Sequence, residues 1–164
     1  MTRRRVVVGV DGSPCSEKAL RWAIALAERT DAEVEAVASW QDPVTTTYAF
    51  GLTPVYAGDQ DWAGITGRCL QESVARAVEE LHPRVAIVTR VAEGNPAQVL
   101  LDAAASAQLL VVGSRGHGTL AGILLGSVSQ HCVQHAPCPV VVIPAGGSWD
   151  AAEEAWTATV TSAG

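Results

Sequence analysis

Three glycines and a serine at a fixed spacing mark the segment between residues 113 and 127. Gly113, Gly116, Gly126 and Ser127 follow the pattern G-x2-G-x9-G-S. Glycine lets a ligand approach the backbone closely, because no Cβ shields the N–H groups. Ser127 stands where a helix is expected to begin, and the free N–H groups and dipole of a helix N-terminus favour an anion. The spacing therefore predicts a cradle for phosphate groups.

Four basic or titratable side chains lie in or after this loop. Arg115 and His117 could reach the phosphates or could be solvated loop side chains, and the sequence leaves both readings open. His131 and His135 have the i, i+4 spacing of some zinc ligands, but no third ligand accompanies them. We therefore expect a surface or helix-capping role for the two histidines and no metal site.

Other nucleotide-binding patterns are missing. The segment Asp11-Gly12-Ser13-Pro14-Cys15 follows the first predicted strand and lacks the G-x-G-x-x-G of dinucleotide sites. A P-loop needs Gly-Lys-Ser/Thr, and Lys18, the only lysine, is not in that context. A phospho-receiver domain needs an aspartate after the third strand, which here ends Thr89-Arg90-Val91-Ala92. The glycine loop remains the strongest candidate.

The elements that must position this loop alternate along the chain. Apolar, β-branched runs predict strands, and the caps Ser13-Pro14 and Asn95-Pro96 and helical periodicity predict helices between them. The strands are expected at residues 5–10, 34–40, 84–91, 108–112 and 139–143, and two of the helices at 59–81 and 126–136. This order predicts a parallel sheet with helices on both faces. Ligands of such sheets bind at the carboxyl ends of the strands, where the winding reverses.

Composition limits the class of protein. The chain has 164 residues, 48% of them hydrophobic, which fits one domain with a sizeable core. A net charge of −6 argues against a nucleic-acid partner, and no apolar run is long enough for a membrane span or a signal peptide. The four cysteines include no C-x-x-C pair, so we expect buried thiols in the cytoplasm rather than a zinc site or disulfides.

The chain resembles the universal stress protein family, in its ATP-binding branch. The glycine loop matches the family pattern G-x2-G-x9-G-[ST] in full, and so do the flanks at residues 6–13, 94–97 and 136–142. The resemblance covers about residues 3 to 144, and Gln108 is a departure where many members carry an acidic residue. It implies a doubly wound five-stranded sheet of order 3-2-1-4-5, with the reversal between the first and fourth strands.

The resemblance also implies roles for matching residues. Asp11, at the end of the first strand, would contact the adenosine part of a nucleotide. Backbone atoms of Ser39 or its neighbour Ala38, at the end of the second strand, would meet adenine. The glycine loop would follow the ribose and phosphates, and the helix start would hold phosphates through N–H groups, with Ser129 a weaker candidate. The expected nucleotide-binding residues are Asp11, Gly12, Ser13, Ala38, Ser39, Gly113, Arg115, Gly116, His117, Gly126, Ser127, Val128 and Ser129.

Three functions follow as hypotheses. The first is an ATP-binding regulatory protein of the stress response, with Mg²⁺ left open, that couples nucleotide occupancy to a protein partner. The second is an ATP-using enzyme, although residues 113–134 hold no carboxylate to fix a metal, so we expect slow hydrolysis at most. The third is an interaction module without nucleotide.

Domain limits and assembly complete the expectations. Residues 1–144 would form the nucleotide-binding domain, and residues 145–164 a tail that is either disordered or a short helix. The long segment 41–58, rich in Pro, Gly and aromatic residues, is expected to be functional or mobile. The family implies a homodimer formed through the last strand, Val140 to Ile143, which lies at the sheet edge in the order 3-2-1-4-5.

Overall fold

The computed structural model describes residues 4–42, 60–116 and 125–146. His117, nearly all of the 41–58 segment and residues 147–164 of the tail lie outside the described residues, so their predicted roles are not addressed below. The elements, in chain order, are β1 (Arg5–Gly9), α1 (Pro14–Thr30), β2 (Glu33–Trp40), α3 (Trp62–Leu81), β3 (Ile87–Glu93), α4 (Pro96–Ala104), β4 (Leu109–Gly113), α5 (Ser127–His135) and β5 (Val140–Ile143).

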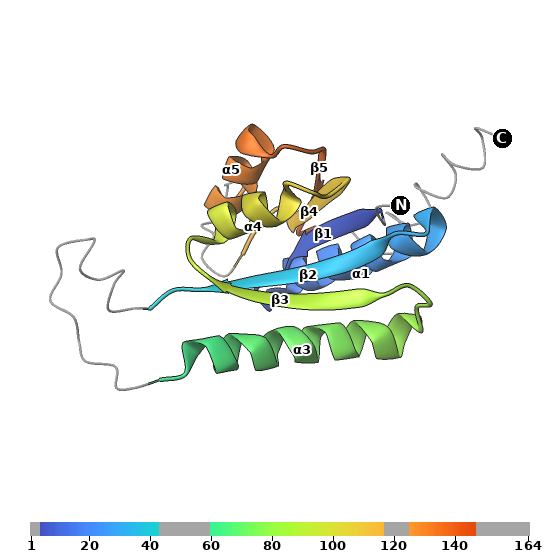
Figure 1. Ribbon diagram of the computed structural model, residues 1–164, viewed down its shortest axis with the longest axis horizontal. Helices are drawn as coiled ribbons and strands as arrows, with labels where there is room; N and C mark the ends of the chain where they lie inside the picture. The colour runs from blue at the N-terminus through green and yellow to red at the C-terminus, as the bar shows by residue number, and fades with distance from the viewer. Residues whose placement is uncertain (1–3, 43–59, 117–124, 147–164) are drawn as a thin grey trace, which may run out of the picture.

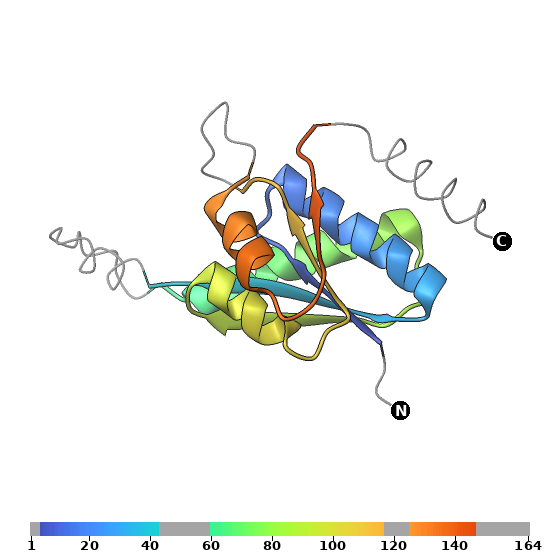
Figure 2. The same ribbon diagram turned by 90° about the horizontal axis from the view of Figure 1, so that it is seen from above.

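All five strands run parallel in one sheet of order β3-β2-β1-β4-β5, which confirms the predicted topology (Figure 1). The predicted helices on both faces are also confirmed: α1 and α3 pack on one face, and α4 and α5 pack on the other. The winding reverses between β1 and β4, whose carboxyl ends lie side by side as seen from above in Figure 2. A ligand site is expected at that reversal.

Alternation along the buried strands divides the core in two. Val6 and Val8 face α1 and α3, whereas Val7 faces α4 and α5, and all three are almost completely buried. Strands covered on both faces must be apolar at every position, which explains why the sequence shows continuous β-branched runs rather than alternation. The two layers fix the strand ends rigidly, as a binding site requires.

Two helices begin at the caps that the sequence predicts. The Ser13 hydroxyl accepts a hydrogen bond from the N–H of Ser16, with Pro14 in the first turn of α1. The Asn95 side chain caps α4 in the same way. Within the described ranges, none of the helices has both the length and the apolar character that crossing a bilayer requires.

Some predicted element limits are wrong by two or three residues. Strand β3 begins at Ile87 rather than at residue 84, because the N–H groups of Arg84 and Val85 donate to the carboxylate of Glu28 instead of joining the sheet. Helix α3 begins at Trp62 rather than at residue 59, because Asp61 caps it by accepting the N–H of Gly64 at 2.8 Å. Both shifts leave the site unaffected.

Candidate functional site

A cavity of about 590 Å³ opens at the carboxyl ends of β1, β2 and β4. This is the predicted location, at the reversal of the winding. Its polar end is formed by residues at the end of β1, in the segment after β4 and at the start of α5. Of the predicted nucleotide-binding residues, those that line it are Asp11, Ser39, Gly113, Arg115, Gly116, Gly126, Ser127, Val128 and Ser129.

Three predicted residues do not line the cavity. Gly12 adopts a left-handed φ of 78°, which favours glycine, and so turns the chain from β1 towards α1. Ser13 is buried and caps α1. The side chain of Ala38 belongs to the core beneath α1 and α3. These three residues support the elements around the cavity and do not line it.

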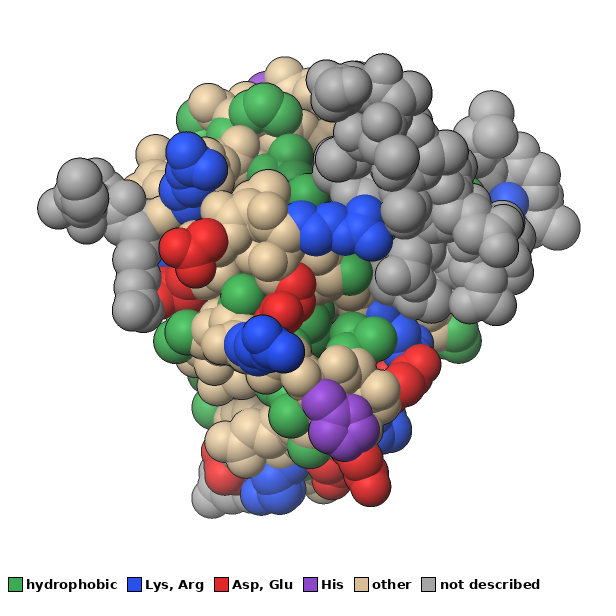
Figure 3. All heavy atoms as spheres, turned by 90° about the vertical axis from the view of Figure 1, so that its right-hand side faces the viewer, with side chains coloured by type: hydrophobic (Ala, Val, Ile, Leu, Met, Phe, Trp, Pro, Cys, Tyr) green, Lys and Arg blue, Asp and Glu red, His purple; other side chains and the backbone are tan. Residues whose placement is uncertain are grey.

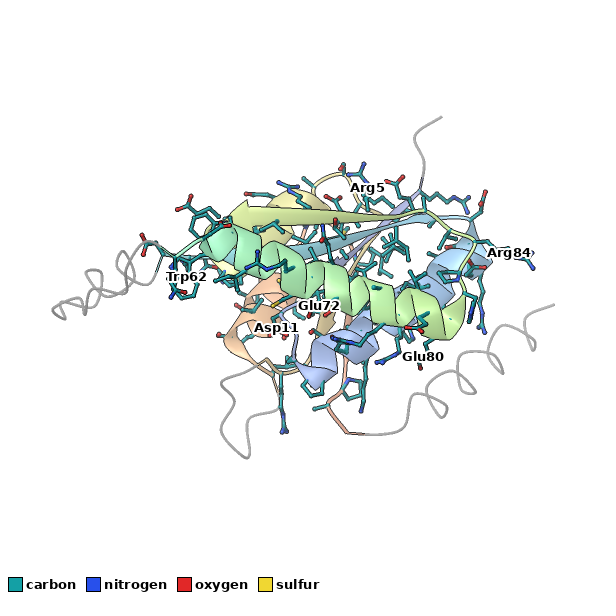
Figure 4. All side chains as sticks on the ribbon, turned by 90° about the horizontal axis from the view of Figure 1, so that it is seen from below. Arg5, Asp11, Trp62, Glu72, Glu80 and Arg84 are labelled. Carbon is teal, nitrogen blue, oxygen red and sulfur yellow. The ribbon has the colours of Figure 1, made fainter. Side chains whose placement is uncertain are left out.

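Asp11 is held in a defined orientation. Its Oδ1 accepts the N–H of Ser13 at 2.9 Å, and its own N–H donates to the hydroxyl of Ser16 at 3.3 Å. This local turn is typical of aspartate. The other carboxylate oxygen faces the glycine loop: a Cβ added to Gly116 would lie 2.7 Å from Oδ2. Asp11 lies beside the start of α1, as Figure 4 shows, and its carboxylate approaches the backbone that follows β4.

Gly113 is a packing glycine. A Cβ at this position would lie 2.9 Å from Sγ and 3.0 Å from the backbone carbonyl carbon of Cys15, so β4 can approach α1 only without a side chain here. The carbonyl of Gly113 accepts the hydroxyl of Ser129 at 2.6 Å, which ties the first turn of α5 to the end of β4. Although Gly113 lines the cavity, its contacts thus position β4 against α1 and α5.

The N-terminus of α5 is open towards the cavity. Gly126 is the N-cap and provides no side-chain hydrogen bond, and its own N–H donates to the carbonyl of Ser114 at 2.7 Å. The first bond within the helix runs from the N–H of Gln130 to the carbonyl of Gly126. Within the described residues, the N–H groups of Ser127, Val128 and Ser129 therefore have no partner, as at an uncapped helix start.

Arg115 brings a positive charge to the same end of the cavity. A Cβ added to Gly126 would lie 3.8 Å from the Arg115 Cα, so this residue is adjacent to the α5 N-terminus. Its Nε is buried, and no hydrogen-bond partner for it exists within the described residues. A buried donor without a partner is unfavourable, so the arrangement is suited to an anion.

The other end of the cavity is apolar. Val10 and Val37 close it from the sheet, and Pro96, Val99 and Leu100 of α4 form a wall that the sequence reasoning missed. Helix α4 packs closely on β1, because a Cβ at the end of that strand would lie 2.9 Å from Leu100 Cδ1. A planar apolar ring could be bound between these side chains.

The far end of the sheet has a different character. Figure 3 views the molecule from that side, and its acidic and basic side chains are interspersed over the described surface. The cavity end, in contrast, combines an apolar wall, an open helix N-terminus and a guanidinium group.

The fold and the cavity define a doubly wound α/β protein whose cavity, at the switch point, has one polar end suited to an anion and one apolar end. The chain belongs to the universal stress protein family, whose model matches residues 2–144.

Known relatives agree with this assignment. The chain is 41% identical over 137 residues to a universal stress protein of Mycobacterium tuberculosis, covering 84% of this chain and 44% of that protein. This chain spans about half the length of the curated relatives it matches.

Two solved structures share the fold. A universal stress protein in complex with cAMP is 27% identical, with a TM-score of 0.61 over 89% of this chain and 100% of that one. One from Archaeoglobus fulgidus in complex with dAMP is 23% identical, with a TM-score of 0.61 over 87% and 99% of the two chains, a level that indicates the fold alone.

Proposed function

We propose that this protein binds an adenine nucleotide, ATP, in the cavity at the carboxyl ends of β1 and β4. The observation that carries the proposal lies at one end of the cavity, whose other end is apolar. There Arg115, whose Nε has no partner among the described residues, stands beside the uncapped N-terminus of α5. Phosphate groups match the first end and a purine matches the second.

Each part of the nucleotide has a complementary group. The Asp11 carboxylate only accepts hydrogen bonds, so it suits the ribose hydroxyls. Adenine would lie against the α4 wall, near Ser39 and the backbone of Ala38. The N–H groups of Ser127 and Val128, with that of Ser129, would hold phosphate oxygens, and the exposed Ser127 hydroxyl would add a bond.

Related proteins support the ligand class. The structure of one universal stress protein of this fold is in complex with cAMP and that of another is in complex with dAMP, so adenine nucleotides are the shared chemistry. Mg²⁺, if it accompanies ATP, would be held mainly by phosphate oxygens, because Asp11 is the sole carboxylate among the described residues that line the cavity.

The bound nucleotide would be held rather than turned over. Backbone N–H groups stabilise ground-state phosphates, whereas catalysis needs groups that bind the transition state better than the substrate. With Asp11 engaged by the ribose, the described lining offers no second carboxylate to activate water. We therefore assign a regulatory role in which occupancy changes partner interaction; an ATP-using enzyme is the second candidate.

The proposal also covers the domain limits, the cellular location and the oligomeric state of the protein. Residues 1–144 would act as the binding domain, with residues 145–164 as a tail, in the cytoplasm. Strand β5 is the edge strand of the sheet, and its outward backbone groups would pair with those of a second copy in a two-fold homodimer.

Two measurements test the function. Mass spectrometry of small molecules released from the denatured purified protein should find an adenine nucleotide. A steady-state assay should find ATP turnover well below the roughly 10 s⁻¹ typical of enzymes. Turnover near that typical rate, lost when the cradle is blocked by Gly126→Val, would instead favour the enzyme.

A further inference from the structure

Gly116 lies between the carboxylate of Asp11 and the N-terminus of α5, where Arg115 is also adjacent. On one side, a Cβ added to Gly116 would lie 2.7 Å from Oδ2 of Asp11. On the other side, a Cβ added to Gly126 would lie 3.9 Å from the Gly116 nitrogen and 3.8 Å from the Arg115 Cα. The polar end of the cavity is therefore divided into an acidic part at Asp11 and a part at the start of α5 that favours anions.

These two parts select different chemical groups. A carboxylate repels a phosphate and accepts hydrogen bonds from hydroxyl groups. The Arg115 guanidinium has a buried Nε without a partner among the described residues, and it accompanies the free N–H groups of Ser127 and Val128. An anionic oxygen bound there would satisfy several donors at once.

The division distinguishes linear from cyclic nucleotides. A linear 5′-triphosphate has a free 3′-hydroxyl to offer Asp11 and a chain that extends away from the ribose towards Arg115. A 3′,5′-cyclic phosphate has lost that hydroxyl and holds its single charge against the ribose, on the side of Asp11. It therefore meets repulsion at the carboxylate and leaves the buried Nε of Arg115 without a partner among the described residues.

We propose that Arg115 is the specificity-determining residue of this site, and that it makes the protein prefer linear 5′-polyphosphates of adenosine over 3′,5′-cyclic AMP. This proposal rests on the proposed function, because it assumes that the ribose lies at Asp11 and the phosphates at α5. The preference depends on Arg115 because, among the described residues that line the cavity, it is the sole cationic side chain.

The test is titration calorimetry with ATP, cyclic AMP and adenosine. The variants are Arg115→Gln, which removes the charge, Arg115→Lys, which keeps it, and Arg68→Gln, an exposed arginine on α3, as the matched control. We expect the unchanged protein to bind ATP at least tenfold more tightly than cyclic AMP. Arg115→Gln should weaken ATP binding about tenfold or more while changing cyclic AMP and adenosine by less than about threefold.

The remaining results separate the two proposals. Arg115→Lys should retain part of the preference for ATP, and Arg68→Gln should retain all of it. Cyclic AMP binding as tightly as ATP to the unchanged protein, or an equal loss for both ligands in Arg115→Gln, would overturn this inference alone. Failure of all three ligands to bind the folded protein would overturn the proposed function with it.

Discussion

The carboxylate of Asp11 lies against the backbone of Gly116, so close that a Cβ added to the glycine would sit 2.7 Å from Oδ2. Residues from opposite ends of the domain sequence thus meet across the cavity, one at the end of β1 and the other after β4. The glycine of the motif is needed here because any side chain would displace the carboxylate.

Substitution of Gly116 by alanine should weaken ATP binding at least tenfold. The new Cβ meets the end of a flexible side chain, so Asp11 can rotate and the fold should survive, but the rotated carboxylate no longer faces the ribose. Calorimetry measures the affinity and thermal unfolding checks the fold. Gly146→Ala is the matched control, because a Cβ there has no neighbour within 4 Å among the described residues, and it should change neither quantity. Equal affinity in Gly116→Ala and the control would show that Asp11 does not hold the ligand.

Gly113→Ala should destabilise the fold itself, by about 1–3 kcal/mol, the usual cost of overpacking. The Cβ would meet Cys15 at 2.9 Å from Sγ and also at 3.0 Å and 3.1 Å from backbone atoms, which cannot move without shifting α1. Urea unfolding measures the loss. Adding Cys15→Ala should recover only part of it, since the backbone contacts remain. Full recovery would mean that the sulfur alone causes the conflict.

Substitutions of two serines of α5 should have different effects, one on stability and the other on ATP affinity. Ser129→Ala removes the part-buried 2.6 Å bond to the carbonyl of Gly113, and the loss of a typical hydrogen bond costs about 0.5–1.5 kcal/mol of unfolding free energy. Ser127 is exposed, so Ser127→Ala should change stability by less than about 0.5 kcal/mol and lower only ATP affinity. Denaturant unfolding and calorimetry on both variants check this, and a reversed pattern would contradict the assignment.

Much of the site follows from sequence, and the failures have a physical pattern. The strands of valine and the caps at Ser13 and Asn95 are local signals, so the sheet, its helices and the place of the cavity could be predicted. The order of the strands came from the family resemblance. The contact of Gly113 with Cys15 could not be predicted, because it joins elements about a hundred residues apart.

The apolar wall was missed for a related reason. Leu100 belongs to the core and also lines the cavity, and no local sequence pattern says that a core face also closes a cavity. Similarly, the N–H of Gly126 was expected to reach phosphate, whereas its bond to Ser114 is a non-local contact. Local periodicity predicts elements; the identity of their neighbours depends on tertiary packing.

Thiol reactivity should differ sharply between two helical cysteines. Burial raises the pKa of Cys132 from 9.0 to about 11, so its thiolate is scarce near neutral pH, whereas Cys69 is exposed on α3. An alkylating reagent at pH 8 should modify Cys69 in the native protein and Cys132 only after unfolding, as peptide mapping would show. Rapid native labelling of Cys132 would contradict its burial.

The raised pKa of Cys132 also predicts how the free energy of unfolding changes at high pH. Because the pKa of Cys132 is higher in the folded protein than in the unfolded chain, the protonated thiol contributes to the free energy of unfolding. This contribution is fully present below pH 9 and is lost as pH rises from about 9 towards 11. In that window the unfolded state binds fewer protons, so the unfolding free energy should fall. Cys132→Ala, compared with the unchanged protein across the window, should show a shallower decline.

Strand β5 should mediate the proposed dimer. The carbonyl of Pro139 accepts the N–H of Leu110 in β4, and that of Ile143 accepts the N–H of Ser114, the residue after β4. By alternation, Val140 and Val142 direct their backbone groups outward. Val142→Pro removes an outward N–H without removing a bond to β4, and should convert a dimer into a monomer. Light scattering at micromolar concentration measures the mass, with circular dichroism to check the fold. A variant that stays dimeric would place the interface elsewhere.

The central claim, that the glycine loop and the start of α5 hold the phosphates of ATP, is tested most directly by calorimetric titration of ATP into the unchanged protein and into Gly126→Val. A Cβ at Gly126 makes only ordinary contacts of 3.6–3.9 Å, so the variant should fold, while its branched side chain projects beside Arg115 and the N-terminus of α5. We predict at least a tenfold loss of affinity, about 1.4 kcal/mol or more. Unchanged ATP affinity in a folded Gly126→Val protein would contradict the claim.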